Sequence, residues 1–206
     1  MKNRTVSIAA GVFAAMFLVM GFAGFSSVPP SGVEIGKAVP DFSLTGIDGK
    51  AYNLSQYKGD VVVLEWSNPN CPFVQRVYRE SIMQDVQKKY KGKVVWLTIN
   101  STNPSHRDHE TAKALEEKYK EWGASYTAYL LDPDGTVGRM YDAKTTPHMF
   151  VINKQGTLVY EGAIDNDPRG NKSEKTNYVD QALTELLNGK DIAVATTRSY
   201  GCSVKY

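Results

Sequence analysis

Runs of apolar residues alternate with amphipathic segments along most of the chain. Near-continuous apolar runs at 61–66, 94–99 and 128–131 are typical of strands that are covered on both faces of a sheet. Between them, over 72–90 and 111–122, apolar residues recur at helical spacing with charged residues at the intervening positions. The order strand, helix, strand, helix, strand predicts an α/β domain.

The pattern changes after these strands and helices. A short helical piece is expected at 137–141, and two strands at 148–152 and 157–162 are expected to form a hairpin. The apolar positions within 179–187 predict a last helix. Strands that alternate with helices and finish in an antiparallel hairpin make a three-layer α/β sandwich with a mixed central sheet.

The first residues, 1–27, have the composition of a targeting segment. Lys2 and Arg4 precede a long uncharged apolar stretch, which is followed by small residues. This order is typical of a signal peptide, and the stretch is nearly long enough to serve instead as an N-terminal membrane anchor. Either fate predicts an exported domain, which in a bacterial cell is periplasmic or membrane-anchored and facing the periplasm.

The remaining chain divides by composition. Residues 28–37 are rich in Pro, Ser and Gly and are expected to form a linker. Residues 38–189 carry the predicted strands and helices and form the domain, and residues 190–206 are a polar C-terminal tail that carries Cys202 and is expected to be mobile.

Charge and cysteine content narrow the function classes. The 206 residues carry a net charge of +2 with both signs interspersed, which argues against a nucleic-acid-binding protein. An α/β core of this size needs no disulfide for its stability, so the two cysteines, Cys71 and Cys202, require another explanation. We therefore expect redox chemistry.

Cys71 lies between a predicted buried strand and the start of a helix. Asn68 is a good N-cap and Pro69 suits the first helical position, which would place Cys71 in the first turn. The free N–H groups and positive dipole end of that turn would stabilise a thiolate, and Pro72 would fix the turn locally. The alternative is a buried cysteine that acts only as a small apolar residue.

Residues 38–189 resemble the thioredoxin superfamily, in particular its redoxin branch related to alkyl hydroperoxide reductase and thiol-specific antioxidant (AhpC/TSA) proteins. The matching segments are the opening 39–44, the strand followed by Cys71-Pro72, the pair Thr146-Pro147 and the hairpin end 160–162. The resemblance implies a three-layer α/β/α thioredoxin-like fold with a mixed central sheet. It also implies a cis peptide bond before Pro147, on a loop that faces the active thiol.

Several residues near Cys71 differ from the family's motifs, and these differences bear on which reaction the protein can catalyse. Asn68 stands where dithiol members have the first cysteine of their motif, so exchange within a single motif is excluded. Leu64 and Asn68 replace the Pro and the Thr or Ser that precede the peroxidatic cysteine of peroxiredoxins. The buried acid of thioredoxin corresponds to Val62. Glu65 could accept a proton in its place, or could equally form a surface ion pair.

Cys202 is a candidate resolving thiol. The tail is long enough for Cys202 to reach Cys71 and to release a mixed disulfide or a sulfenic acid as an intramolecular disulfide. The alternatives are an incidental tail thiol and an intermolecular bridge. Because an unpaired exposed thiol is a liability in an oxidising compartment, the resolving role is favoured.

The main hypothesis is an exported thiol oxidoreductase that acts on a protein disulfide or a peroxide through Cys71. Thr146 and Pro147 would offer backbone to an extended substrate beside the sulfur, and an external dithiol reductant would reset the cycle. No organic cofactor is implied.

The second hypothesis is a module of the same fold that binds copper, or docks a partner, without turnover. Copper would be held by Cys71 and His148, which is a weak ligand set. Arg76, one turn beyond Cys71, could support the thiolate, but it is expected to be solvated. The pair His106 and His109 is expected to be solvated as well.

Overall fold

The structure is a computed structural model that describes Met1 and residues 32–206. Apart from Met1, the expected signal or anchor at 1–27 lies outside the described residues, as does the first part of the linker. None of the described helices is long and apolar enough to cross a lipid bilayer.

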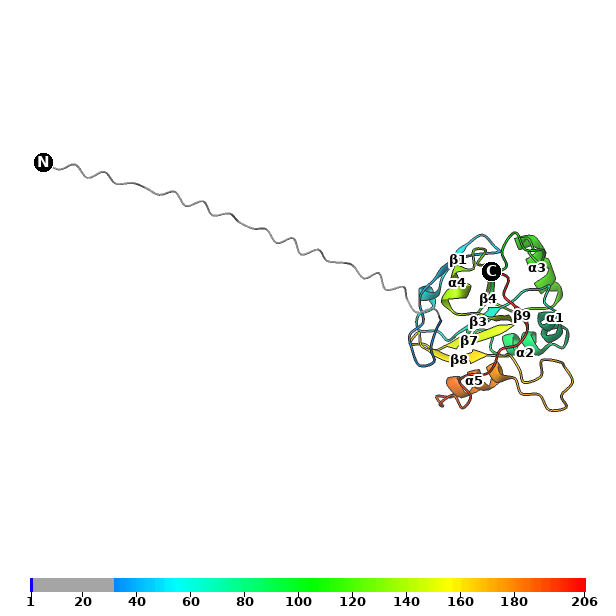
Figure 1. The fold of residues 1–206 in the computed structure, drawn as a ribbon. Helices are drawn as coiled ribbons and strands as arrows, with labels where there is room; N and C mark the ends of the chain where they lie inside the picture. The colour runs from blue at the N-terminus through cyan, green and yellow to red at the C-terminus, as the bar shows by residue number, and fades with distance from the viewer. Residues whose placement is uncertain (2–31) are drawn as a thin grey trace. The chain divides into compact units, whose positions relative to one another are not determined.

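Seven strands form one mixed sheet at the centre of the domain (Figure 1). In spatial order they are β2 (Ala51–Asn53), β1 (Ser43–Gly46), β5 (Ala128–Leu131), β4 (Val95–Asn100), β3 (Val62–Trp66), β7 (His148–Ile152) and β8 (Leu158–Gly162). Strands β3, β4 and β5 are parallel, whereas β7 and β8 form an antiparallel hairpin beside β3. The predicted mixed sheet is confirmed.

Helices cover both faces of this sheet and complete three layers. One face is covered by α1 (Pro72–Arg79), α2 (Ile82–Lys89), α3 (Ala112–Glu121) and α5 (Tyr178–Leu187). The other face is covered by α4 (Thr136–Met140) and the 3-10 helix η1 (Leu54–Tyr57). Alternation along β3 separates the two cores, since Val63 packs into the first and Leu64 into the second.

The single helix expected over 72–90 is two helices, α1 and α2. Ser81 between them has a left-handed backbone with φ of 60°. The Gln84 side chain turns back and donates to the Tyr78 carbonyl at 2.6 Å and to the Trp122 carbonyl at 2.8 Å. The helical spacing of apolar residues continues across the break, so the pattern alone could not reveal it.

The tail at 190–206 is packed against the domain, and the expectation that it is mobile is wrong. Its residues Cys202–Ser203 form β9, which pairs antiparallel with β6 (Thr145–Thr146). Figure 1 shows β9, in red, beside α1. The Val204 N–H donates to the Lys144 carbonyl at 3.2 Å, so the pairing continues beyond β9. Backbone pairing fixes a tail whose composition alone looks like that of a loop.

Candidate active site

Cys71 is the N-cap of α1, and the helix begins at Pro72. The prediction that Asn68 caps the helix and that Cys71 lies in its first turn is therefore wrong, because the helix begins three residues later than expected. Pro72 occupies the first helical position, where proline needs no N–H partner. The Cys71 sulfur still lies at the N-terminal end of the helix, but it makes no capping hydrogen bond to it.

Asn68 instead builds the turn that leads into Cys71. Its side-chain oxygen accepts from the Asn70 N–H at 2.7 Å, and its backbone carbonyl accepts from the Cys71 N–H at 3.0 Å. Its side-chain amide donates to Thr102 Oγ1 at 2.9 Å. Asn68 is buried. Its hydrogen bonds to the Asn70 and Cys71 N–H groups position the cysteine through the turn rather than through the helix.

The loop around Pro147 faces the Cys71 thiol, as the resemblance implies. The Thr146–Pro147 peptide bond is cis. Cys71 Sγ donates to the Thr146 carbonyl oxygen at 3.0 Å. With only 2% of its surface exposed, Cys71 is nearly sealed in this arrangement.

Cys202 lies next to Cys71. In the β6–β9 pair, Cys202 is the register partner of Thr146, the residue whose carbonyl accepts from Cys71. Burial raises the pKa of the Cys202 thiol, and the neighbouring Cys71 thiol raises it further. Both thiols are free. The structure thus brings together two cysteines that are far apart in the sequence.

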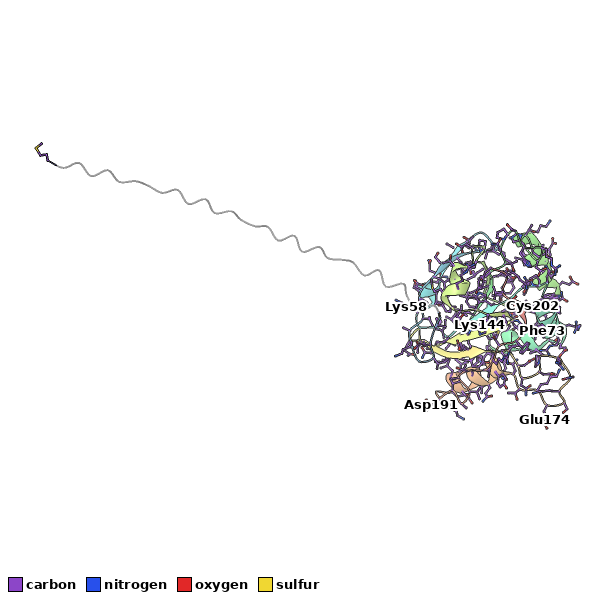
Figure 2. The ribbon with its side chains drawn as sticks, viewed as in Figure 1. Lys58, Phe73, Lys144, Glu174, Asp191 and Cys202 are labelled. Carbon is purple, nitrogen blue, oxygen red and sulfur yellow. The ribbon has the colours of Figure 1, made fainter. Side chains whose placement is uncertain are left out.

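A buried ion pair holds the segment before Cys202. Arg76 Nη2 contacts both carboxylate oxygens of Asp165, at 3.0 and 3.2 Å, and donates to the Tyr200 hydroxyl at 2.7 Å. The Tyr200 hydroxyl in turn donates to Asp165. Figure 2 labels Cys202 close to Phe73, whose ring lies 5.9 Å from that of Tyr200. The expectation that Arg76 is solvated is wrong, because its side chain is 7% exposed and anchors the tail.

Glu65 is completely buried, so it forms no surface ion pair. Its carboxylate accepts from Trp96 Nε1 at 2.8 Å and from the Tyr78 hydroxyl at 2.9 Å. Gln87 and Thr98 donate to it as well, both at 3.2 Å. Burial raises the pKa of Glu65 and these donors oppose the rise. Its described hydrogen bonds remain within this cluster and do not reach Cys71, so the proton-acceptor role stays a prediction.

His148 and Cys71 lie on opposite sides of the sheet. The His148 ring is 4.5 Å from that of Phe150, which belongs to the core on the α4 side, whereas Cys71 belongs to the core on the α1 side. His148 Nδ1 accepts from the Lys144 N–H at 3.2 Å. The two predicted copper ligands are therefore not brought together. Within residues 32–206, no three His, Cys, Asp or Glu side chains gather as a metal site requires.

The buried His148 predicts a loss of stability in acid. Burial, with a smaller effect of Lys144, lowers the pKa of His148 to about 4. The ordinary pKa of a histidine is about 6.5, so between about pH 6.5 and pH 4 the unfolded chain binds a proton that the folded chain does not. The free energy of unfolding therefore falls as the pH drops from about 6.5 to about 4. The cost at pH 4 is about 3 kcal/mol.

Urea unfolding at pH 7 and pH 4 tests this expectation. The free energy of unfolding of the wild type should fall by about 3 kcal/mol more than that of His148→Gln, which retains an acceptor for the Lys144 N–H. Equal falls in the two proteins would show that His148 is not the group responsible.

Several site residues were not found from the sequence. Asp165 and Tyr200 carry no motif, and their partner Arg76 is 89 and 124 residues away. Gly201 did offer a signal. Its backbone passes so close to Thr146 that a Cβ would overlap the Thr146 carbonyl, and its φ is +133°. A glycine directly before a cysteine is consistent with such a close approach.

Comparison with known proteins agrees with this geometry. The model of the AhpC/TSA family matches residues 35–161, which is more than half of the chain. The chain belongs to the AhpC/TSA family. A hypothetical protein of Sinorhizobium meliloti 1021 has a similar structure, with 25% identity, a TM-score of 0.76 and coverage of 85% of this chain and 96% of the other.

Two further relatives extend the comparison. An uncharacterized conserved protein of Geobacillus kaustophilus has 28% identity, a TM-score of 0.75 and coverage of 84% and 92% of the two chains. The thiol-disulfide oxidoreductase ResA of Bacillus subtilis is 24% identical over 160 residues, 77% of this chain and 84% of its own length. The thioredoxin-like fold of this AhpC/TSA protein is established, and the chain is an oxidoreductase.

Proposed function

We propose that this AhpC/TSA protein is a thiol-disulfide oxidoreductase that uses Cys71 as nucleophile and Cys202 as resolving thiol. The proposal depends chiefly on the position of Cys202, which pairs through β9 with the residue that accepts the Cys71 hydrogen bond. The family membership and the similarity to ResA support the thiol-disulfide class of reaction.

The proposed reaction proceeds in two exchange steps. The Cys71 thiolate attacks a substrate disulfide; a bond forms between Cys71 and one substrate sulfur, and the other sulfur leaves as a thiolate that takes a proton. Cys202 then gives up its proton and attacks Cys71, and the second substrate thiol leaves. The substrate has gained two electrons, the protein holds a Cys71–Cys202 disulfide, and an external dithiol reduces it again.

The raised pKa of Cys202 fits its place as the second nucleophile. A thiol whose pKa lies above its ordinary value stays protonated near neutral pH and does not compete with Cys71 for the substrate. The described hydrogen bonds of Glu65 stay within its own buried cluster, so its role as proton acceptor remains a prediction outside these two steps. We also propose that the protein acts outside the cytoplasm, periplasmic or membrane-anchored, because residues 1–27 have the composition of a signal or anchor.

Trapping of the covalent intermediate tests this mechanism. Reduced Cys202→Ser should form a stable adduct between Cys71 and half of a disulfide substrate, because the thiol that would release it is absent. The wild type, treated identically, should instead accumulate the internal disulfide. Intact-mass spectrometry distinguishes the two products, and Ser203→Ala on β9 serves as the matched control. The same short-lived adduct in wild type and Cys202→Ser would refute the resolving role.

A further inference from the structure

The tail covers the thiol that is proposed to react. Cys71 is 2% exposed, and Tyr200 and Cys202 of the tail pack against the core cluster that contains it. Cys202 pairs with Thr146, at the same edge on which Thr146 and Pro147 are expected to hold an extended substrate. A disulfide therefore reaches the Cys71 sulfur only after this pairing opens, and the role of Thr146 and Pro147 in holding a substrate stays a prediction.

Residues 204–206 of the tail cross to the other face of the sheet. Cys202 packs against the core on the α1 side, whereas Val204 packs against the core on the α4 side. Tyr206 follows against α4, close to where Figure 1 marks the C-terminus. Up to about 13 Å of chain separates Tyr206 from Cys202. Because α4 and Cys71 lie on opposite faces of the sheet, Tyr206 acts on the reacting sulfurs only through the tail.

Tyr206 occupies a slot on α4. Its hydroxyl donates to the Ala143 carbonyl at 2.7 Å, and the centre of its ring lies 4.5 Å from the guanidinium carbon of Arg139. Gly135 and Gly138 form the floor of this slot, because a Cβ at either position would overlap the Tyr206 ring. A glycine inside a helix costs stability relative to alanine, so the room left for this ring explains Gly138.

A buried carboxylate holds the slot in place. Asp132 is fully buried and accepts from the Gly138 N–H at 2.8 Å and from the Val137 N–H at 3.2 Å. It also accepts from the Ser101 hydroxyl at 2.6 Å. Asp132 follows β5 and Ser101 follows β4, so α4 is tied to the ends of two central strands. The slot therefore offers Tyr206 a fixed position.

We infer that Tyr206 is a positioning residue for the resolving thiol: docked in the α4 slot, it closes the tail over Cys71 and places Cys202 for its attack. This inference rests on the proposed function and deepens it. It requires the two exchange steps to respond in opposite directions. Undocking of Tyr206 exposes Cys71 to a disulfide and speeds the first step. It also takes Cys202 away from the mixed disulfide and slows the second step.

Stopped-flow absorbance with one equivalent of dithiobis(nitrobenzoate), a disulfide whose thiolate is coloured, follows both steps on the full chain. Attack by the Cys71 thiolate forms a mixed disulfide and releases one coloured thiolate. Cys202 then gives up its proton and attacks the Cys71 sulfur, which forms the internal disulfide and releases the second thiolate. The reagent has gained the two electrons that the two cysteines have lost.

Tyr206→Ala should speed the first release roughly fivefold and slow the second by a similar factor, because a hydrogen bond and the contact with Arg139 are lost. The anchor of Tyr200 on Arg76 remains, so the tail is loosened and not detached. Tyr206→Phe keeps the ring in the slot, and both of its rates should lie between those of Tyr206→Ala and the wild type.

Gly138→Ala tests the slot from the side of α4. Its new Cβ would lie 2.6 Å from the Tyr206 hydroxyl, so the ring must move. Both rates should change in the same directions as in Tyr206→Ala, and the double variant should behave as Tyr206→Ala alone. Tyr52→Ala is the matched control, since it removes a hydroxyl that donates to Asp48 at 3.0 Å on the outermost strand β2, and it should change neither rate. If Gly138→Ala does not fold, the comparison of Tyr206→Ala with Tyr52→Ala still decides.

The outcomes separate this inference from the proposed function. In Tyr206→Ala, an unchanged rate of either release, or a change of both rates in the same direction, would overturn the inference and leave the proposed function standing. A second release that is as fast in Cys202→Ser as in the wild type would overturn the resolving role of Cys202, and the inference with it.

Discussion

Cys71→Ser is expected to reduce turnover of disulfide substrates on the order of 10³-fold or more, to the uncatalysed background. The hydroxyl of serine is a far weaker nucleophile than a thiolate near neutral pH, and Cys202 is poorly suited to replace it because its pKa is raised. The measurement is the steady-state reduction of a small disulfide with an external dithiol in excess.

The control for this prediction is a protein with the same fold. Serine at position 71 can donate to the Thr146 carbonyl as the thiol does, so the free energy of unfolding should change little. Turnover within a few-fold of the wild type in Cys71→Ser would end the proposal that this thiol is the nucleophile.

Arg76→Met is expected to lower the free energy of unfolding by about 3–5 kcal/mol, because it leaves the buried Asp165 carboxylate without its cation. The same change frees Tyr200, which orients the segment before Cys202. We therefore expect the internal disulfide to form more slowly as well. Urea unfolding gives the first effect, and quenched thiol alkylation gives the second.

Tyr200→Phe separates the two effects. It keeps the ring packed against Phe73 and keeps the Arg76–Asp165 pair, so its cost in stability should be only about 1 kcal/mol. If Arg76→Met were no less stable than Tyr200→Phe, the ion pair would not be the anchor of the tail.

The layers of the fold could be predicted because burial leaves a local pattern. The apolar run of β3 is buried on both faces, and every one of its five residues is buried. The break at Ser81 left no such pattern, because it depends on Gln84 turning back to the Tyr78 and Trp122 carbonyls. Local spacing predicts which face of a helix is apolar, but not a hydrogen bond made from a distant element.

The candidate active site also has features that could be predicted from the sequence and features that could not. Cys71 and the cis bond before Pro147 could be anticipated, the first from its position after a strand and the second from the family resemblance. The docking of Cys202 on Thr146 could not, because polar tails leave no periodic signal and pairing of two-residue strands is decided by long-range contacts. The burial of Arg76 is equally hidden from local patterns, because its partner Asp165 is 89 residues away in the sequence.

Disulfide mapping of the protein after mild oxidation tests the central claim most directly. Reduced protein at low concentration is treated with one equivalent of a disulfide oxidant, blocked with an alkylating reagent and digested for mass spectrometry. We predict a monomer that has lost two hydrogen atoms and yields one linked peptide pair containing Cys71 and Cys202. A monomer in which Cys71 remains free, or a dimer bridged through two copies of Cys202, would contradict the account.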